Sequence, residues 1–335
     1  MTLAPSQMLK QTARDKRAVI AMSEGADRRI VEGALVAHRA GLADIILVGE
    51  RARVSDTLDE LGGAVGGGLS IHDPGDSPLS EDFAREFLAL RAKKGVDAQA
   101  AAQAVRDPLV YAALLVRLGH ADGTVGGAVA TTSDVVRAAI QMIGKSPDAA
   151  LVSSFFLMYP PENATPHARA MLYSDSGLVI DPNADELASI AAISARSFRA
   201  LMRDEPRIAM LSFSTKGSAR HSTVTKVTDA TETLRTAHPE LLVDGELQFD
   251  AAFVPSVGQS KAPESQVAGI ANVMIFPNLD AGNIGYKITQ RLGGYTAIGP
   301  VLQGLNKPAN DLSRGCVASD VTEMIAVTVL QAQDV

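Results

Sequence analysis

The sequence predicts an α/β protein of about two domains, built on parallel β-structure. Short apolar runs alternate with stretches of helical spacing along the whole chain, which is typical of this class. The chain has 335 residues, 46% of them hydrophobic, which is enough for separate cores at roughly 150 residues per domain. The first elements follow the order strand, helix, strand, and such a unit joins parallel strands by a right-handed crossover.

Strands are predicted wherever a short apolar run is bounded by turn-forming residues: 18–22, 45–49, 151–159, 207–213, 241–248, 271–276 and 295–301. Helices are predicted where apolar residues recur at helical spacing: 27–39, 80–118 as a succession of helices, 131–142, 185–202, 224–237, 284–292 and 320–331. The adjacent glycines Gly66, Gly67 and Gly68 cannot hold a regular element cheaply, so residues 61–69 are predicted to form a mobile surface turn. Residues 123–130 are predicted to form a further glycine-rich connection.

Charge and cysteine content exclude several classes of protein. With 31 basic and 38 acidic residues the net charge is −7, which argues against nucleic acid or an anionic membrane as a partner. The single cysteine, Cys316, cannot form an internal disulfide, and no CxxC, HExxH or Cys/His cluster has the spacing of a metal site. The apolar runs are much shorter than the ~18 residues of a membrane span. We therefore expect a cytoplasmic protein without structural metal, which holds any anionic ligand with local arginines and lysines.

Three loops combine hydroxyl groups with cations at the start of a predicted helix: Thr131-Thr-Ser-Asp134 followed by Arg137, Ser214-Thr-Lys-Gly-Ser218, and Asn310-Asp-Leu-Ser-Arg-Gly315. Taken singly, each loop could simply cap the next helix. In the first loop, Ser133 or Asp134 is the expected N-cap, and Arg137 is expected in the first helical turn, where the helix dipole disfavours a cation. Together, the three loops indicate a polyanionic ligand. Neither GxGxxG after the first strand nor GxxxxGK[ST] is present, so an ordinary nicotinamide enzyme is not expected.

The last of these loops carries the groups best suited to transfer chemistry. Ser313, Arg314 and Asp320 place a hydroxyl, a permanent cation and a carboxylate close together in the sequence. Arg314 could neutralise a phosphoryl oxygen in bidentate fashion, and Asp320 could accept a proton as a general base. Asp320 with Glu323 also fits a capping box, so the local pattern leaves a helix cap as the alternative. Cys316 could be an acyl-cysteine nucleophile, with a small buried cysteine as the alternative.

Longer motifs connect these loops to a known family. They are Ala130-Thr-Thr-Ser-Asp-Val-Val-Arg137, Asp244-Gly-Glu-Leu-Gln248, Asn272-Val-Met-Ile-Phe-Pro277, Ala281-Gly-Asn-Ile-Gly-Tyr-Lys287, and Gly299-Pro-Val-Leu-Gln-Gly-Leu-Asn-Lys-Pro308 running on to Cys316. Through them the chain closely resembles the phosphate acetyltransferase family, or phosphotransacetylases, from residue 123 onward and more weakly before it. The resemblance implies reversible acetyl transfer between coenzyme A and inorganic phosphate. Acetyl-CoA, phosphate and acetyl phosphate are then substrates, and neither a metal nor a bound cofactor is implied.

The resemblance also implies an architecture like that of isocitrate and isopropylmalate dehydrogenases, with two α/β lobes and an active-site cleft between them. Residues 1–147 and 300–335 would form the first lobe, which carries the catalytic loop, and residues 148–299 the second. The chain would pass between the lobes near Pro147 and Pro300. A homodimer is implied as well.

Residue by residue, the resemblance assigns catalysis to Ser313, Arg314 and Asp320 and places two further functional arginines at Arg91 and Arg137. The loops described above add four more residues as substrate-binding candidates: Thr132, Ser133, Ser214 and Lys216.

The mechanism implied is direct transfer in a ternary complex. A coenzyme A thiol with an ordinary pKa near about 8.5 needs a base at neutral pH. Asp320 would accept its proton, and a carboxylate suited to this task is expected to be partly buried. The thiolate would then attack the acetyl carbonyl while Arg314, Arg137 and Arg91 hold the phosphate. Ser313 would donate a hydrogen bond to the thiol or the oxyanion.

Three alternatives remain open on the sequence alone. A phosphate butyryltransferase or propionyltransferase would share every catalytic group and differ only in its acyl pocket. A metal- and NAD(P)-dependent decarboxylating dehydrogenase of the same fold would require a cluster of magnesium-binding aspartates, which the sequence does not suggest. A non-catalytic assembly domain is disfavoured by the intact Ser313, Arg314 and Asp320.

Overall fold

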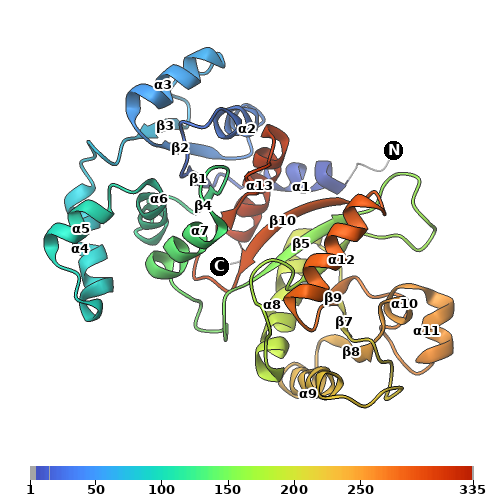
Figure 1. Ribbon diagram of the computed structural model, residues 1–335. Coiled ribbons are helices and arrows are strands. Elements are labelled where there is room, and N and C mark those ends of the chain that lie inside the picture. The colour runs from blue at the N-terminus through green and yellow to red at the C-terminus, as the bar shows by residue number, and fades with distance from the viewer. Residues whose placement is uncertain (1–4, 15, 334–335) are drawn as a thin grey trace. The chain divides into compact units, whose positions relative to one another are not determined.

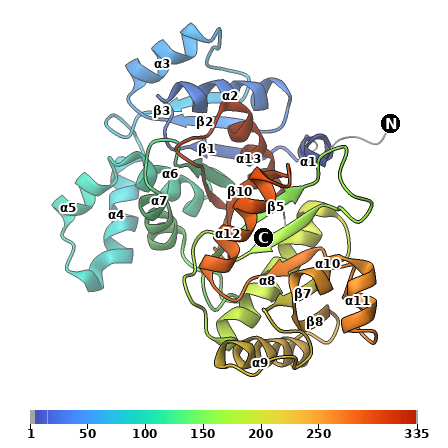
Figure 2. The ribbon, with the colours of Figure 1, turned by 45° about the vertical axis from the view of Figure 1, so that its right-hand side comes forward.

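The computed structural model describes residues 5–14 and 16–333 and divides into two compact units. Unit 1 consists of Met1–Ser146 and Leu305–Val335, and unit 2 of Pro147–Gly304. Each unit is a β-sheet with helices packed on it (Figures 1 and 2). The chain returns to unit 1 at Leu305, beyond Pro300, because the strand that contains this proline continues to Gln303.

The sheet of unit 1 is entirely parallel, with strand order β11-β4-β1-β2-β3. Its strands are β1 Val19–Met22, β2 Asp44–Val48, β3 Leu69–His72, β4 Gly123–Gly126 and β11 Ala309–Asp311. The central strands are buried runs of apolar and small residues, as expected for a parallel sheet covered on both faces. The predicted parallel sheet is thus confirmed for this unit.

Helices cover both faces of this sheet. They are α1 Pro5–Ala13, α2 Arg28–Arg39, α3 Arg51–Glu60, α4 Ser80–Arg91, α5 Ala98–Ala104, α6 Pro108–Arg117, α7 Thr132–Ala138 and α13 Ala318–Gln331, with a 3₁₀ turn η1 Ala92–Lys94 and a π-helical turn η2 Ala139–Ile143. Helices α2 and α13 pack side by side (Figure 1). Ala21, Ile46 and Val48 of the strands do not face these two helices. They belong to a core that also contains Tyr111 and Leu114 of α6. The alternation of side chains along each strand therefore supplies two cores from one sheet.

The sheet of unit 2 is mixed, with strand order β10-β5-β6-β9-β7-β8. Its strands are β5 Ser153–Tyr159, β6 Met171–Ser174, β7 Arg207–Leu211, β8 Leu242–Leu247, β9 Val273–Ile275 and β10 Thr296–Gln303. Strand β5 is antiparallel to both β10 and β6, whereas the remaining pairs are parallel. Alternation of strands and helices in the sequence does not reveal this antiparallel edge.

The helices of unit 2 are α8 Ala184–Met202, α9 Ser222–Ala237, α10 Phe249–Phe253, α11 Pro255–Lys261 and α12 Leu279–Arg291. A capping box begins α8, in which Asn183 Oδ1 accepts from Glu186 N and Glu186 Oε2 accepts from Asn183 N, both at 2.9 Å. Phe156 of β5 stacks on Tyr286 of α12 with ring centroids 3.9 Å apart. Across the part of the chain that the structure describes, no helix is both long and apolar enough to cross a membrane.

The glycine-rich segments hold strands that the sequence does not predict. Strand β4 lies within the predicted connection 123–130, because close packing requires glycine there. A Cβ on Gly126 would lie 2.1 Å from Ser23 Oγ, and one on Gly123 would lie 2.5 Å from Thr328 Cγ2. Strand β3 begins at Leu69, where the predicted turn ends.

Candidate active site

One edge of the unit 1 sheet brings together loops that carry several of the predicted site residues. Strands β11, β4 and β1 are adjacent and parallel, so the loops that follow them meet at the same edge. The strand order reverses its direction between β1 and β4. Strands β2 and β3 lie on one side of β1, whereas β4 and β11 lie on the other. Such a topological switch point at the carboxyl ends of parallel strands is where α/β proteins bind ligands.

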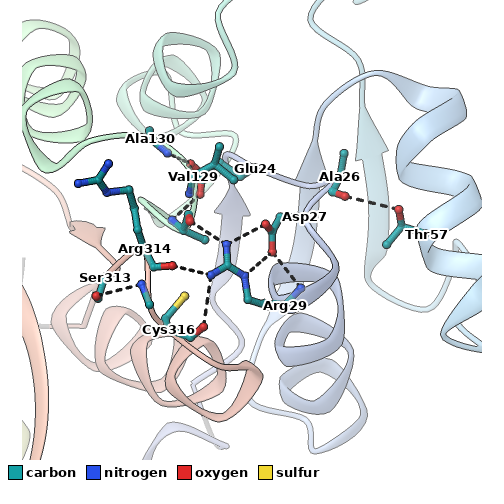
Figure 3. Close-up of polar contacts among 12 residues, drawn as sticks. Glu24, Ala26, Asp27, Arg29, Thr57, Val129, Ala130, Ser313, Arg314 and Cys316 are labelled. Atoms are coloured by element: carbon teal, nitrogen blue, oxygen red, sulfur yellow. Dashed lines mark hydrogen bonds and ion pairs between the residues drawn. The ribbon is translucent and has the colours of Figure 1, made fainter.

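Glu24, in the turn after β1, fixes the loop that follows β4. Its carboxylate accepts hydrogen bonds from three successive backbone N–H groups: Ala128 at 2.7 Å, Val129 at 3.0 Å and Ala130 at 2.7 Å (Figure 3). Hydrogen bonds to a charged acceptor are among the stronger ones in proteins. The loop leading into α7 is therefore held in one conformation from the neighbouring strand.

Arg29, in the first turn of α2, joins three loops at this edge. Its guanidinium makes a bidentate ion pair with Asp27, at 3.0 and 2.9 Å. It also donates to the carbonyl oxygens of Ala128 at 2.7 Å, Arg314 at 2.7 Å and Cys316 at 3.4 Å (Figure 3). The hydrogen bond from Arg29 lowers the pKa of Asp27, so the pair stays ionised. A planar fork of five donors suits this task, which a lysine could not perform.

Sequence reasoning missed both Glu24 and Arg29. Their signal in the sequence is weak but present. Glu24 lies in the Ser-Glu-Gly turn that ends the first strand, and Arg29 places a cation in the first turn of a helix, where the dipole disfavours it. Both make their key contacts to loops about a hundred or more residues away, which no local pattern can show.

Ser313 and Arg314 lie exposed in the loop after β11. Ser313 Oγ accepts a hydrogen bond from Gly315 N at 3.2 Å, which tightens the turn. Arg314 is anchored through its carbonyl oxygen by Arg29, while its side chain points away from that contact (Figure 3). Its guanidinium makes no hydrogen bond or ion pair with the residues that the structure describes, so it is available to an anionic ligand.

Asp320 differs from its prediction in two respects. It is the third residue of α13, and its Oδ2 accepts a hydrogen bond from Val317 N at 3.0 Å, so it closes the helix from inside rather than serving as the N-cap. The predicted partial burial is wrong, since the residue is exposed. Asp320 lies inside the helix and not at its cap because α13 begins at Ala318, two residues before the expected start.

Cys316 is 4% exposed, in agreement with the description as a small buried cysteine. Burial raises the pKa of its thiol, although the charge of Arg29 opposes the rise. A neutral buried thiol is a poor nucleophile, so the acyl-cysteine alternative loses its chemical basis.

The first turn of α7 exposes Thr132 and Ser133 at the same edge. The N-cap is Thr131, whose Oγ1 accepts from Asp134 N at 3.3 Å, and not the predicted Ser133 or Asp134. Arg137 lies in the last turn of α7, not in the first, and pairs with Asp134 at 2.9 Å. The helix begins early enough to place the cation one turn further along.

Arg91 is the last residue of α4, which packs with α5. In both views α6 and α7 lie between α4 and α13 (Figures 1 and 2). Among the hydrogen bonds and ion pairs of residues 5–14 and 16–333, none joins Arg91 to Ser313, Arg314 or Arg137.

Ser214 and Lys216 belong to unit 2, in the loop after β7. Ser214 is fully buried and donates to Glu246 Oε1 at 2.8 Å, so its hydroxyl supports the loop from inside. Lys216 has a left-handed backbone with φ 49°, and its Nζ pairs with the buried Asp244, which also binds Arg235. Burial raises the pKa of Asp244, but the hydrogen bonds from Lys216 and Ser265 and the charge of Lys216 lower it, and the pKa is lowered on balance. Lys216 and Arg235 line a hollow of about 720 Å³ on this unit.

The fold and this edge define a class: an α/β protein whose switch point carries exposed hydroxyls and an arginine that has no ion-pair partner among the described residues. Residues 6–329 match the family model described as phosphate acetyl/butaryl transferase, and the chain belongs to that family. A phosphate acetyltransferase of Paracoccus denitrificans is 46% identical over 331 residues, which cover 99% of this chain and 100% of the relative.

Solved structures agree with this assignment. A phosphotransacetylase from Streptococcus pyogenes has a TM-score of 0.93 at 41% identity and covers 99% of this chain and 98% of its own. A 4-hydroxythreonine-4-phosphate dehydrogenase from Klebsiella pneumoniae has a TM-score of 0.54 at 13% identity, covering 94% of this chain and 98% of its own. The dehydrogenase therefore shares the fold alone.

Proposed function

We propose that this chain transfers an acetyl group reversibly between coenzyme A and inorganic phosphate, by direct thiolate attack in a ternary complex. Family membership and a near full-length relative named phosphate acetyltransferase support the reaction. The observation that carries the proposed site is the loop of Ser313 and Arg314. Its backbone is fixed by Arg29 and its exposed side chains are left to a ligand.

In the direction that forms acetyl-CoA, the thiol proton passes to Asp320 and the thiolate attacks the acetyl carbonyl. A carbon–sulfur bond forms, the bond between the carbonyl carbon and the phosphate oxygen breaks, and phosphate leaves with the electron pair. Arg314 and Arg137 neutralise the phosphate, and Ser313 donates to the developing oxyanion. The arginines supply the positive charge, so the reaction as proposed requires neither a metal nor a bound cofactor.

The remaining substrate-binding residues complete the proposal. Thr132 and Ser133 donate their hydroxyls to phosphate oxygens, and Arg91 adds a further cation. Lys216 holds an anionic part of coenzyme A, and the hollow beside it supports this role. The proposal keeps the two-lobed, isocitrate dehydrogenase-like arrangement with its active-site cleft that the resemblance implies. The fold shared with the 4-hydroxythreonine-4-phosphate dehydrogenase supports this part of the proposal.

A homodimer is proposed for the assembly. Helix α12 supports it, because Ile284, Ile288 and the C-cap residue Leu292 recur every four residues and are 57%, 53% and 85% exposed. A stripe of this kind on a surface helix is typical of a protein–protein contact. The proposed compartment is the cytoplasm, in keeping with the single unpaired Cys316.

The test is release of coenzyme A from acetyl-CoA, measured with and without phosphate. The proposal predicts release that requires phosphate and yields acetyl phosphate. Release that is independent of phosphate would identify a thioesterase instead. Propionyl-CoA and butyryl-CoA in the same assay test the acyl preference, since each methylene is worth about 1–3 kcal/mol in a fitted pocket.

A further inference from the structure

The carboxyl group of Asp311 is buried at the candidate site without a partner. Asp311 is the last residue of β11, two positions before Ser313, and is 1% exposed. Within the described part of the chain, neither of its carboxyl oxygens makes a hydrogen bond of standard geometry. Buried polar groups are almost always paired, so a carboxyl group left open at a ligand-binding edge requires an explanation.

The backbone of the neighbouring strand makes room for this carboxyl group. A Cβ on Gly127 would lie 2.1 Å from Asp311 Oδ1, and Gly127 has a φ of +100°, which favours glycine. The glycine that follows β4 therefore admits the carboxyl group beneath the loop that leads into α7.

Each element packed around Asp311 offers a different group. The loop after β1 brings the negative charge of Glu24, and the start of α7 brings the Thr132 hydroxyl. From α13, the uncharged Thr328 and Gln331 side chains bind the preceding residue of β11. The charge that acts on Asp311 is thus negative, and the hydrogen-bonding groups beside its carboxyl group are the Thr132 hydroxyl and the backbone N–H of Leu312.

These surroundings favour the protonated form. Burial raises the pKa of Asp311 to about 6, the Thr132 hydroxyl opposes the rise, and the charge of Glu24 adds to it. The carboxyl group therefore gains or loses its proton between mildly acidic and neutral pH.

We infer that Asp311 is a positioning residue whose proton sets the direction of the Thr132 hydroxyl. A protonated Asp311 donates to Thr132 Oγ1, and the hydroxyl then donates its own hydrogen outward to a phosphate oxygen. An ionised Asp311 accepts the hydroxyl hydrogen, and the lone pairs of Thr132 then face the phosphate. The inference rests on the proposed function, because it places phosphate beside Thr132.

The test is the KM for phosphate between pH 5.5 and 8.5 in the wild type, Asp311→Asn and Thr132→Val. The asparagine amide donates to Thr132 at every pH, so the variant keeps the hydroxyl in its phosphate-binding direction. Phosphate ionises identically in every assay, so its own titration cancels in the ratio of wild-type KM to variant KM. We expect the ratio for Asp311→Asn to rise about tenfold from pH 5.5 to pH 8, the size of one hydrogen bond to a charged group.

Thr132→Val keeps the carboxyl group and removes the hydroxyl. We expect its KM to be raised at pH 5.5 and to vary with pH in parallel with that of Asp311→Asn. The matched control is Asp76→Asn, the same substitution at an exposed position in a loop of unit 1, for which the ratio should stay constant.

A constant ratio for Asp311→Asn would overturn the inference, as would a Thr132→Val variant that retains the wild-type pH dependence. The wild type also separates the two proposals. If its coenzyme A release does not depend on phosphate, the proposed function fails. If release depends on phosphate but the ratio is constant, only the role of Asp311 fails.

Discussion

Replacing Asp311 by asparagine should stabilise the protein at neutral and alkaline pH. The substitution keeps the shape of the side chain and removes a negative charge that is 1% exposed and unpaired among the described residues. A buried charge without a partner opposes folding, because the unfolded chain exposes the same carboxylate to water.

The magnitude follows from the proton affinity of the folded state. Burial raises the pKa of Asp311 from its ordinary 3.8 to about 6. Each tenfold change in proton affinity is worth about 1.4 kcal/mol, so ionisation lowers the free energy of unfolding by roughly 3 kcal/mol. The folded state binds the proton more tightly than the unfolded chain. The loss is therefore absent below about pH 4 and complete above about pH 7.

Thermal unfolding of both proteins between pH 4 and pH 8 measures this effect. At about 2–4 °C per kcal/mol, the Tm of Asp311→Asn should exceed that of the wild type by up to roughly 6–12 °C at pH 8. The difference should vanish near pH 4, and Asp76→Asn should match the wild type throughout. A variant that is less stable at pH 8, or a difference that is equal at both ends of the range, would refute the reasoning.

Three further changes test the site and the assembly. Arg29→Lys should lower kcat/KM by about 10-fold or more with circular dichroism unchanged, because one ammonium cannot bridge the three loops; a wild-type kcat/KM would contradict the role of Arg29. Asp320→Asn should lower kcat about 100-fold or more if the carboxylate takes the thiol proton, whereas an unimpaired variant would leave it as a helix cap. Ile288→Asp should convert a dimer to a monomer in sedimentation velocity, and an unchanged mass would argue against α12 as the interface.

The α/β class and most elements could be predicted because they depend on local patterns. The run 18–22 and the helical spacing of 185–202 correspond to β1 and α8 within a residue. Strands rich in glycine could not be recognised. The glycines of β4 are required because Ser23 and Thr328, which lie far away in sequence, pack too closely to leave room for a side chain. The antiparallel pairing of β5 is likewise a tertiary choice.

The residues of the candidate site also fall into those that local sequence could predict and those that only the structure reveals. Ser313 and Arg314 could be found because a hydroxyl and a cation stand beside glycine in a loop before a helix. Glu24 and Arg29 act through loops distant in sequence, so their importance emerges only when strands β1, β4 and β11 lie together. Asp311 lies in a segment whose sequence resembles an ordinary polar turn, and only the structure shows that this residue is buried.

The most direct test of the site is the initial rate of acetyl phosphate formation from acetyl-CoA and phosphate by Arg314→Gln. Arg53→Gln, an exposed arginine on α3, is the matched control. We predict that Arg314→Gln loses about 100-fold or more in kcat with its Tm unchanged, as expected for removal of one contact to transition-state charge, while the control keeps the wild-type rate. A folded Arg314→Gln enzyme with wild-type turnover would contradict the placement of the reaction at this loop.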